Sequence, residues 1–493
     1  MHVIIHTGSA VAGLPLLIDR QNEQHALLGL LQAGQPQLAL LTGRRRVGKT
    51  YLLTHAWGTQ PFFLFTAARI TSEINRRQLI EDLARWSGQP LYAENYPTWR
   101  SVFNLLLDLQ PPSPLVVVLE EFQYLADDAG GIGAVASELN AAWERPRTPR
   151  PFLLVLSGSA IGTMEELAAG GGPLYGRFAW QHRLRPFGYW HSAEMTPFTA
   201  LRDQALAYGI FGGTPRYLAA VDTSRTLAEN AARLLLDPRG EVRMLVETAL
   251  DQEEGLRDVA KYRAILRSVA SGSTQRNDIA QRTGLANDAA LRVKLARLEE
   301  LGYIETRSNI DARPNEALRY GIADPAFRFY QRFVEPAISM LARYPADQVW
   351  PQMVAPHLNQ YMGREFERIA VQAYDRHCVS EGLPLVQRWG RWEGIDRQRQ
   401  SLKIDLVAEQ VDGGVLTGAL KWNEQPVEAR VFHNHVDMLR RAADTGRRWA
   451  HRALENGAHM VFVASGGVTD EFRAAASQSP YTVTIWALSD LYQ

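Results

Sequence analysis

The run Gly-Arg-Arg-Arg-Val-Gly-Lys-Thr at residues 43–50 has the residue types and spacing of a phosphate-binding loop. Its two glycines let the backbone turn tightly, so that backbone N–H groups can point inward at phosphate oxygens. Lys49 would supply a positive charge for the outer phosphates, and Thr50 a hydroxyl for Mg2+. We therefore expect a nucleotide site with Mg2+ here. The residues expected to form it are Gly43, Arg44, Arg45, Arg46, Val47, Gly48, Lys49 and Thr50.

The segments on either side of this loop are those that a phosphate-binding loop requires. Residues 38–42 are an apolar run typical of a buried strand, and residues 49–57 can form a helix. A strand that leads through the loop into a helix places the loop at an edge of the sheet. This context argues against an ordinary Gly/Arg loop.

Two carboxylates follow the next apolar run, at residues 114–119. At the carboxyl end of a buried parallel strand, we expect Glu120 to hold Mg2+ through its water shell and Glu121 to polarise the attacking water. In isolation the pair could simply be solvated acids. Asp is more usual in the place of Glu120, and Mg2+ tolerates little distortion of its octahedron, so we expect nucleotide binding with slow hydrolysis.

Further residues are candidates to contact the phosphates of a bound nucleotide. Ser159 closes a third apolar run at residues 151–156, where a γ-phosphate sensor is expected, although it could belong to a mere turn. Arg177 and Arg216 could act within the chain or on a neighbouring subunit, and Pro215, directly before Arg216, is expected to contribute to the nucleotide site with it. The alternative is that they are ordinary surface arginines.

Five strings in this order resemble the archaeal-type ATPases, a branch of the AAA+/STAND group of P-loop NTPases. The strings are GRRRVGKT, VVVLEEFQYL, LVLSGSAIGTME, PLYGR and GGTPRYL. The resemblance extends from residue 18 to the C-terminal region. It implies an ATP-binding core, a small helical lid carrying residues 213–215, a winged helix, and a C-terminal module related to the PD-(D/E)XK nuclease fold.

Composition describes an ordinary globular protein, with 46% apolar and 22% charged residues among 493. Lys+Arg and Asp+Glu number 53 each, so nucleic-acid binding would need a local patch. The single cysteine, Cys378, excludes an intrachain disulfide and suits a reducing cytoplasm. Residues 3–18 are expected to be an entry strand or loop, and no run is long enough to span a membrane.

The winged helix is also indicated by the residues themselves. Helices are predicted at 262–269, 275–283 and 288–301, followed by strands at 302–306 and 318–322. Arg292, Lys294 and Arg297 lie off the leucine stripe of the third helix and could contact duplex DNA. Glutamates dilute this basic surface, so packing within the chain or binding to a protein partner is equally compatible.

The C-terminal segment carries part of a nuclease pattern, namely Glu367, Asp405 and Lys421. Asp405 is expected to end a strand that begins at residue 402. The PD-(D/E)XK pattern has an acid two positions before the lysine, and Ala419 stands there. Because a metal ligand is missing, we expect a catalytically degenerate module that binds or supports other groups.

The sequence thus predicts an α/β protein: a P-loop NTPase parallel-sheet core with a helical lid, a winged-helix domain and a C-terminal α/β nuclease-like domain. The predicted domains are 1–195, 196–256, 257–345 and 346–493. The expected activity is slow Mg-dependent ATP hydrolysis that controls binding of DNA or protein, including a possible homo-oligomer, in the cytoplasm. The alternatives are a nucleotide-gated switch with little turnover, in defence or stress signalling, and an ATP-licensed, metal-dependent endonuclease.

Overall fold

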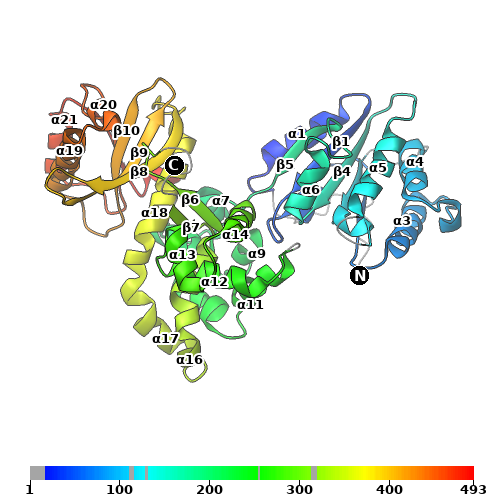
Figure 1. Ribbon diagram of the computed structural model, residues 1–493, viewed down its shortest axis with the longest axis horizontal. Coiled ribbons are helices and arrows are strands. Elements are labelled where there is room, and N and C mark those ends of the chain that lie inside the picture. Colours follow the sequence, from blue (N-terminus) through cyan, green and yellow to red (C-terminus); the bar gives the residue numbers. More distant parts are fainter. Residues whose placement is uncertain (1–16, 110–115, 128–130, 254–255, 313–318) are drawn as a thin grey trace. The chain divides into compact units, whose positions relative to one another are not determined.

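The chain folds into two compact units (Figure 1). The computed structural model describes residues 17–109, 116–127, 131–253, 256–312 and 319–493. The first unit comprises Met1–Pro186 together with Gln252–Leu256, and the second comprises Phe187–Asp251 and Arg257–Gln493. Most of the predicted entry segment, residues 3–16, lies outside the described residues.

The first unit is built on a five-stranded parallel sheet of order β2-β3-β4-β1-β5. Its strands are β1 (Pro36–Thr42), β2 (Phe62–Thr66), β3 (Val116–Glu120), β4 (Phe152–Gly158) and β5 (Phe178–Arg183). A parallel sheet is covered on both faces, which explains the uninterrupted apolar runs in β1, β3 and β4. The predicted P-loop NTPase-type core is confirmed. Because the strands are parallel, the segments that follow β1, β3 and β4 all leave from one edge of the sheet.

Helices pack on both faces of this sheet. They are α1 (Gln21–Leu31), α2 (Lys49–His55), α3 (Ser72–Ser87), α4 (Trp99–Asp108), α5 (Ile132–Trp143) and α6 (Ile161–Ala168). Alternate residues of β3 enter different cores, as the two-residue period of a strand requires. Val117 and Leu119 pack with α3, α4 and α5, whereas Val116 and Val118 pack with α1 and α2.

The second unit begins with an all-helical segment. Its helices are α7 (Tyr189–Met195), α8 (Leu201–Phe211), α9 (Pro215–Leu218), α10 (Leu227–Ala231) and α11 (Glu241–Glu247). The backbone N–H of Phe187 donates to Gly213 O (2.7 Å), and that of Tyr189 donates to the side chain of Gln372 (3.0 Å). These bonds place α7 in the second unit, so the compact first unit is shorter than the core predicted at residues 1–195.

Three helices and a hairpin follow in the order expected of a winged helix. They are α12 (Val259–Ala270), α13 (Arg276–Thr283), α14 (Ala289–Glu300), β6 (Ile304–Arg307) and β7 (Arg319–Ile322). The side chain of Asp288 caps α14, and Leu291, Leu295 and Leu298 are buried as their spacing predicts. The winged-helix interpretation rests on this order, and the boundaries at residues 256 and 345 remain predictions.

A five-stranded mixed sheet of order β12-β11-β10-β9-β8 ends the chain. Its strands are β8 (Val386–Ile395), β9 (Ser401–Gln410), β10 (Val415–Lys421), β11 (His459–Ala464) and β12 (Thr482–Ala487). Helices α15 (Pro325–Phe329), α16 (Ile338–Leu341), α17 (Ala346–Met353) and α18 (Ala355–His377) precede the sheet, and α19 (Ala429–Asp444), α20 (Arg448–Arg452) and α21 (Asp470–Ser477) lie among its later strands. Asp405 was predicted to end a strand, but it lies inside β9, because apolar residues continue beyond it to position 408.

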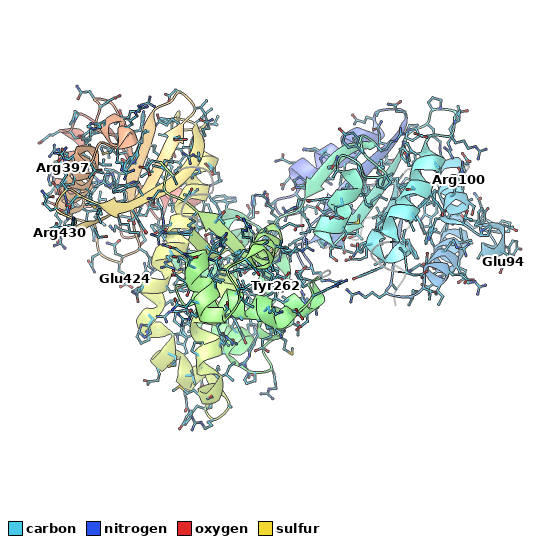
Figure 2. The ribbon with its side chains drawn as sticks, in the orientation of Figure 1. Glu94, Arg100, Tyr262, Arg397, Glu424 and Arg430 are labelled. Carbon is cyan, nitrogen blue, oxygen red and sulfur yellow. The ribbon has the colours of Figure 1, made fainter. Side chains whose placement is uncertain are left out.

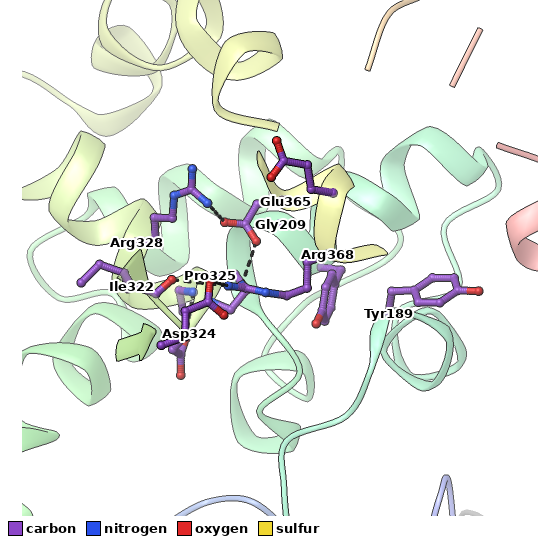
Figure 3. Close-up of polar contacts among 12 residues, drawn as sticks. Tyr189, Gly209, Ile322, Asp324, Pro325, Arg328, Glu365 and Arg368 are labelled. Carbon is purple, nitrogen blue, oxygen red and sulfur yellow. Dashed lines mark hydrogen bonds and ion pairs between the residues drawn. The ribbon is translucent and has the colours of Figure 1, made fainter. Parts of the chain in front are cut away.

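A buried ion network ties these parts of the second unit together (Figure 3). Glu365 of α18 is fully buried and bonds Arg328 of α15 (2.5 Å) and Arg368 (3.1 Å). Arg368 also reaches Glu305 of β6 (3.1 Å). Burial acts to lower the pKa of Arg368, but Glu365 and Glu305 outweigh it and raise the pKa. Among the described residues, no helix is both long and apolar enough to cross a membrane.

Candidate functional site

The loop between β1 and α2 adopts a conformation that its glycines make possible. At Gly43 the φ angle is 153°, and a Cβ there would lie 2.7 Å from the carbonyl oxygen of Leu184. Gly48, at the N-terminal cap of α2, has φ 93°, in the left-handed region that only glycine adopts at little cost. Arg46 also has a positive φ, 71°, and its guanidinium donates to the side chain of Gln252 (2.6 Å).

The Lys49 side chain folds back over this loop. It is 6% exposed, and its ammonium donates to Gly43 O (2.8 Å) and Arg44 O (3.1 Å). Burial lowers the pKa of Lys49, while the charges of Glu121 and Glu120 oppose that shift. The ammonium therefore lies at the carbonyl oxygens of the loop. Oxygens of a bound phosphate would compete with these carbonyls for the ammonium.

Glu120 is buried at the end of β3 and contacts two hydroxyls. Its Oε1 accepts from the Thr50 hydroxyl, and its Oε2 accepts from the Thr66 hydroxyl (3.0 Å). Carboxylate and hydroxyl oxygens are hard ligands of the kind that Mg2+ prefers beside nucleotide phosphates. The donor set thus fits the ion, and Thr50 and Glu120 are the residues that would hold it. Thr66 was missed, although it too stands at the carboxyl end of a parallel strand.

Glu121 comes next, with φ 52° and ψ 45°. Such left-handed backbone costs a non-glycine residue on the order of 1–3 kcal/mol, so the surrounding bonds must hold it. Its Oε2 accepts from the Ser159 hydroxyl (2.7 Å), the Ser159 backbone N–H (3.2 Å) and the Gln123 amide (2.6 Å). No described residue donates to its Oε1. One oxygen is thereby anchored, and the other is available to a water molecule.

The protonation state of Glu121 follows from the same contacts. Burial acts to raise its pKa, but the charge of Lys49 and the hydrogen bonds from Ser159 and Gln123 outweigh burial and lower the pKa. The carboxylate is therefore ionised at neutral pH, as a proton acceptor must be. Ser159, predicted as a phosphate sensor, is brought to the site, where its contact is with Glu121.

Two arginines at this edge converge on one phenol. The guanidinium groups of Arg45 and Arg69 each donate to the Tyr124 hydroxyl at 2.8 Å. Arg45 belongs to the predicted loop, whereas Arg69 and Tyr124 were not predicted. No sequence pattern marks them, because their meeting depends on how the segments after β2 and β3 pack.

The other predicted phosphate-reading residues have different surroundings. Arg177 bonds Asn140 of α5 (2.8 Å) and Glu144, which directly follows that helix, and these bonds would have to break before it could reach a nucleotide in the loop. Pro215 and Arg216 belong to the second unit, where Pro215 opens α9 and Arg216 pairs with Glu241 (2.5 Å). Their predicted role remains a prediction.

The three basic residues of α14 are not equivalent. Arg292 is exposed, and its side chain has no ion-pair partner among the described residues. The Lys294 ammonium lies 5.6 Å from the ring centroid of Tyr262, a residue labelled in Figure 2. Arg297 bonds Glu300 at 2.6 Å. A DNA-binding role would therefore rest mainly on Arg292.

The C-terminal module brings Glu367, Asp405 and Lys421 together, with a fourth residue between the carboxylates. The Lys403 ammonium lies 2.7 Å from Asp405 and 4.0 Å from Glu367, whereas Lys421 lies 3.9 Å from Asp405. Lys403 was missed, although the two-residue period of β9 puts it on the same face as Asp405. The described residues contain no group of three or more His, Cys, Asp or Glu side chains that could hold a metal.

Comparison with known proteins places these features in a family. Residues 17–221 match the family model of an ATPase domain predominantly from Archaea, and residues 330–432 match a family of archaeal and bacterial proteins of unknown function. An uncharacterized protein of Methanocaldococcus jannaschii is 23% identical over 418 residues, covering 83% of this chain and 88% of that protein.

Solved structures with similar folds include two archaeal proteins. The Walker-type ATPase of Pyrococcus abyssi is 22% identical, with a TM-score of 0.45, covering 64% of this chain and 96% of its own. The ORC2 protein of Aeropyrum pernix is 15% identical, with a TM-score of 0.41, covering 71% and 95%. The family match and the loop geometry together identify residues 17–221 as an ATP-binding P-loop NTPase domain, similar to the ATPase domain found predominantly in Archaea.

Proposed function

We propose that the chain is a slow, Mg-dependent ATPase whose nucleotide state controls the binding of DNA or protein by its second unit. The observation that carries this proposal is the arrangement of Glu121. Its Oε2 is held by Ser159 and Gln123, and its ionised Oε1 is left for a water molecule at the edge where Lys49 lies. A base that is anchored through one oxygen can orient a nucleophile through the other.

Each residue of the site has a defined task in this proposal. The loop N–H groups and Lys49 bind the phosphates, and Glu121 orients the attacking water and accepts its proton. Thr50 and Glu120 would hold Mg2+, which supplies charge neutralisation at the phosphates when bound. Both oxygens of Glu120 already contact hydroxyls, and its longer side chain fits the octahedral ion less well than Asp, which favours slow turnover.

A short segment gives a route by which the loop can influence the second unit. Gln252 belongs to the first unit, whereas α11 before it and α12 after it belong to the second. The Arg46 guanidinium, from the phosphate-binding loop, donates to Gln252. A change of the loop on nucleotide binding would therefore act on a segment that is covalently continuous with α11 and α12.

The residues of the C-terminal module give less support to the endonuclease alternative. Lys403 lies between Glu367 and Asp405, where a divalent ion would have to bind, and Ala419 supplies no third acid. We therefore propose no cleavage activity for the C-terminal module.

The decisive experiment measures ATP binding by calorimetry and phosphate release, with and without duplex DNA, for the wild type and Lys49→Ala. Removing the buried ammonium should abolish ATP binding at sub-millimolar concentration and leave the fold intact, as judged by circular dichroism. Arg430→Ala, which removes an exposed cation of the C-terminal module, should bind ATP like the wild type. Equal ATP affinity in wild type and Lys49→Ala would refute the site.

A further inference from the structure

A cavity of about 440 Å³ lies within the second unit, apart from the phosphate-binding loop. Its walls come from β6 and the residue after it, one face of α18, and strands β8, β9 and β10. The volume falls within the range of about 300–1,000 Å³ that is typical of small-molecule pockets. Its lining includes charged groups, short hydroxyl groups, the amide of Gln372, three aliphatic side chains and one indole ring, that of Trp389.

Two carboxylates of this cavity, those of Asp405 and Glu367, have both oxygens facing cations. The two oxygens of Asp405 face Lys403 (2.7 Å) and Lys421 (3.9 Å). Those of Glu367 face Lys403 (4.0 Å) and Arg307 (3.5 Å). A divalent cation would have to displace these lysine and arginine groups. The two carboxylates are therefore neutralised by side chains, without a metal.

These pairs belong to one continuous chain of ion pairs that begins and ends with a cation. In order, its members are Arg328, Glu365, Arg368, Glu305, Arg307, Glu367, Lys403, Asp405 and Lys421. The alternation leaves one positive charge in excess. Part of this chain, from Arg328 through Glu365 to Arg368, is drawn in Figure 3.

Two more arginines add positive charge, Arg391 in the cavity wall and Arg364 outside the lining. Arg391 lines the cavity and shares the single carboxylate of Glu393 with Arg319. Arg364, one turn before Arg368 on α18, forms no ion pair with a described residue. Partial burial and the charges of Arg328, Arg307 and Arg391 lower the pKa of Arg364, against the pull of Glu367. A bound anion would relieve this repulsion.

Trp389 supplies the aromatic surface of the pocket, beside the aliphatic side chains of Val371, Leu406 and Leu420. Its ring packs edge-on against Tyr374 with centroids 5.1 Å apart, and its indole N–H donates to Asp375 at 2.9 Å. The ring is thereby fixed in orientation while it forms part of the cavity wall. A fixed, partly exposed indole is a surface on which a nucleobase can stack.

We infer that this cavity binds a nucleoside phosphate without a metal ion, with the phosphate on the arginine groups that line it and the base on Trp389. The site is distinct from the ATP site of the first unit and does not depend on it. The same chemistry is offered by a free mononucleotide and by the 5′-phosphorylated end of a nucleic-acid strand. The probes below distinguish these two sources.

The test uses the full chain carrying Lys49→Ala, with EDTA present, so that binding to the phosphate loop and binding through metal are both suppressed. Calorimetry is run with AMP, adenosine, inorganic phosphate and a 5′-phosphorylated dinucleotide. We expect AMP to bind at least about tenfold more tightly than adenosine, because a charge-assisted bond contributes that much. Tighter binding of the dinucleotide than of AMP would assign the site to strand ends, and the reverse would assign it to free nucleotides.

Matched substitutions locate the binding. Arg391→Gln removes a cation from the cavity and should weaken AMP binding about tenfold. Arg397→Gln makes the same change at an exposed position of the same module, outside the cavity, and should have no effect (Figure 2). Trp389→Leu should weaken AMP binding about tenfold as well, but leave inorganic phosphate unaffected. This variant keeps the inference testable if Arg391→Gln does not fold.

A reciprocal experiment probes Lys403. Lys403→Met removes the cation between the two carboxylates, so AMP binding should fall and Mn2+ binding, measured without EDTA, should rise above that of the parent protein. The inference is overturned if AMP does not bind the parent protein, if Arg391→Gln and Arg397→Gln bind it equally, or if AMP binding requires a metal.

Discussion

Replacing Glu121 by Gln tests the proposed hydrolytic site with the smallest change of shape. The carboxylate accepts three hydrogen bonds, all through Oε2. The amide oxygen of Gln can take that position, because the donors from Ser159 and Gln123 require an acceptor there. Its NH2 group then replaces Oε1, which faces no described donor. The substitution therefore removes the proton acceptor and preserves the anchoring bonds.

The size of the effect follows from this geometry. A positioned general base contributes about 10²- to 10⁴-fold to a rate, which is about 3–5 kcal/mol of activation free energy. ATP affinity should change much less, because the phosphate contacts come from the loop and Lys49. Loss of the Glu121 charge removes one of the three carboxylates that oppose the lowering of the Lys49 pKa, so a small change in affinity is expected.

The assay is phosphate release in a single turnover at saturating ATP and Mg2+, together with ATP binding by calorimetry. Ser159→Ala serves as a matched variant, because it removes one anchoring bond and keeps the carboxylate. We expect kcat to fall about tenfold in Ser159→Ala with KM unchanged, since a single hydrogen bond to a charged group is lost. Normal turnover in Glu121→Gln, with turnover abolished in Glu120→Gln, would reverse the roles of the two acids.

Three further predictions concern the second unit. Glu365→Ala leaves two buried arginines without their shared carboxylate and should lower the free energy of unfolding by about 3–5 kcal/mol, measured by urea denaturation; an unchanged midpoint would contradict the network's structural role. Burial lowers the pKa of His435 from 6.5 to about 4 in the folded protein. Below about pH 6.5 the unfolded chain therefore binds a proton at this histidine that the folded protein does not bind until about pH 4. Stability should therefore fall by about 3 kcal/mol between pH 7 and pH 4 through this group, and His435→Gln should remove that part of the pH dependence. If α14 binds duplex DNA, Arg292→Ala should reduce the slope of log affinity against log salt by about 0.9, whereas Arg297→Ala, which loses a side chain already paired with Glu300, should change it less.

The core of the first unit was predictable because its signals are local. The loop at residues 43–50, the apolar runs on either side of it and the acids after β3 each lie within a few residues of one another. The rule that parallel strands end at one edge then brings Lys49, Glu120, Glu121 and Ser159 together. The same rule covers Thr66 at the end of β2, which no motif includes.

Contacts between distant segments could not be predicted in this way. The convergence of Arg45 and Arg69 on Tyr124 depends on the packing of three loops. The placement of α7 in the second unit depends on its bonds to Gly213 and Gln372, far along the chain. The strand that carries Asp405 was predicted too short, because a charged residue on one face of a strand was taken as its end.

In the C-terminal module, a sequence motif gives the position of a site but does not determine its chemistry. Against the predicted nuclease pattern, Ala419 removes one negative charge, and Lys403 adds one positive charge between the remaining acids. Relative to the nuclease pattern, these two changes together raise the net charge by two units, as much as a divalent ion would. The carboxylates at 367 and 405 are therefore retained as partners of lysine and arginine side chains, and their presence in the sequence does not by itself indicate a metal. A positive excess that the chain itself provides is suited to holding a phosphate, and it lacks the metal-activated water that would cleave one.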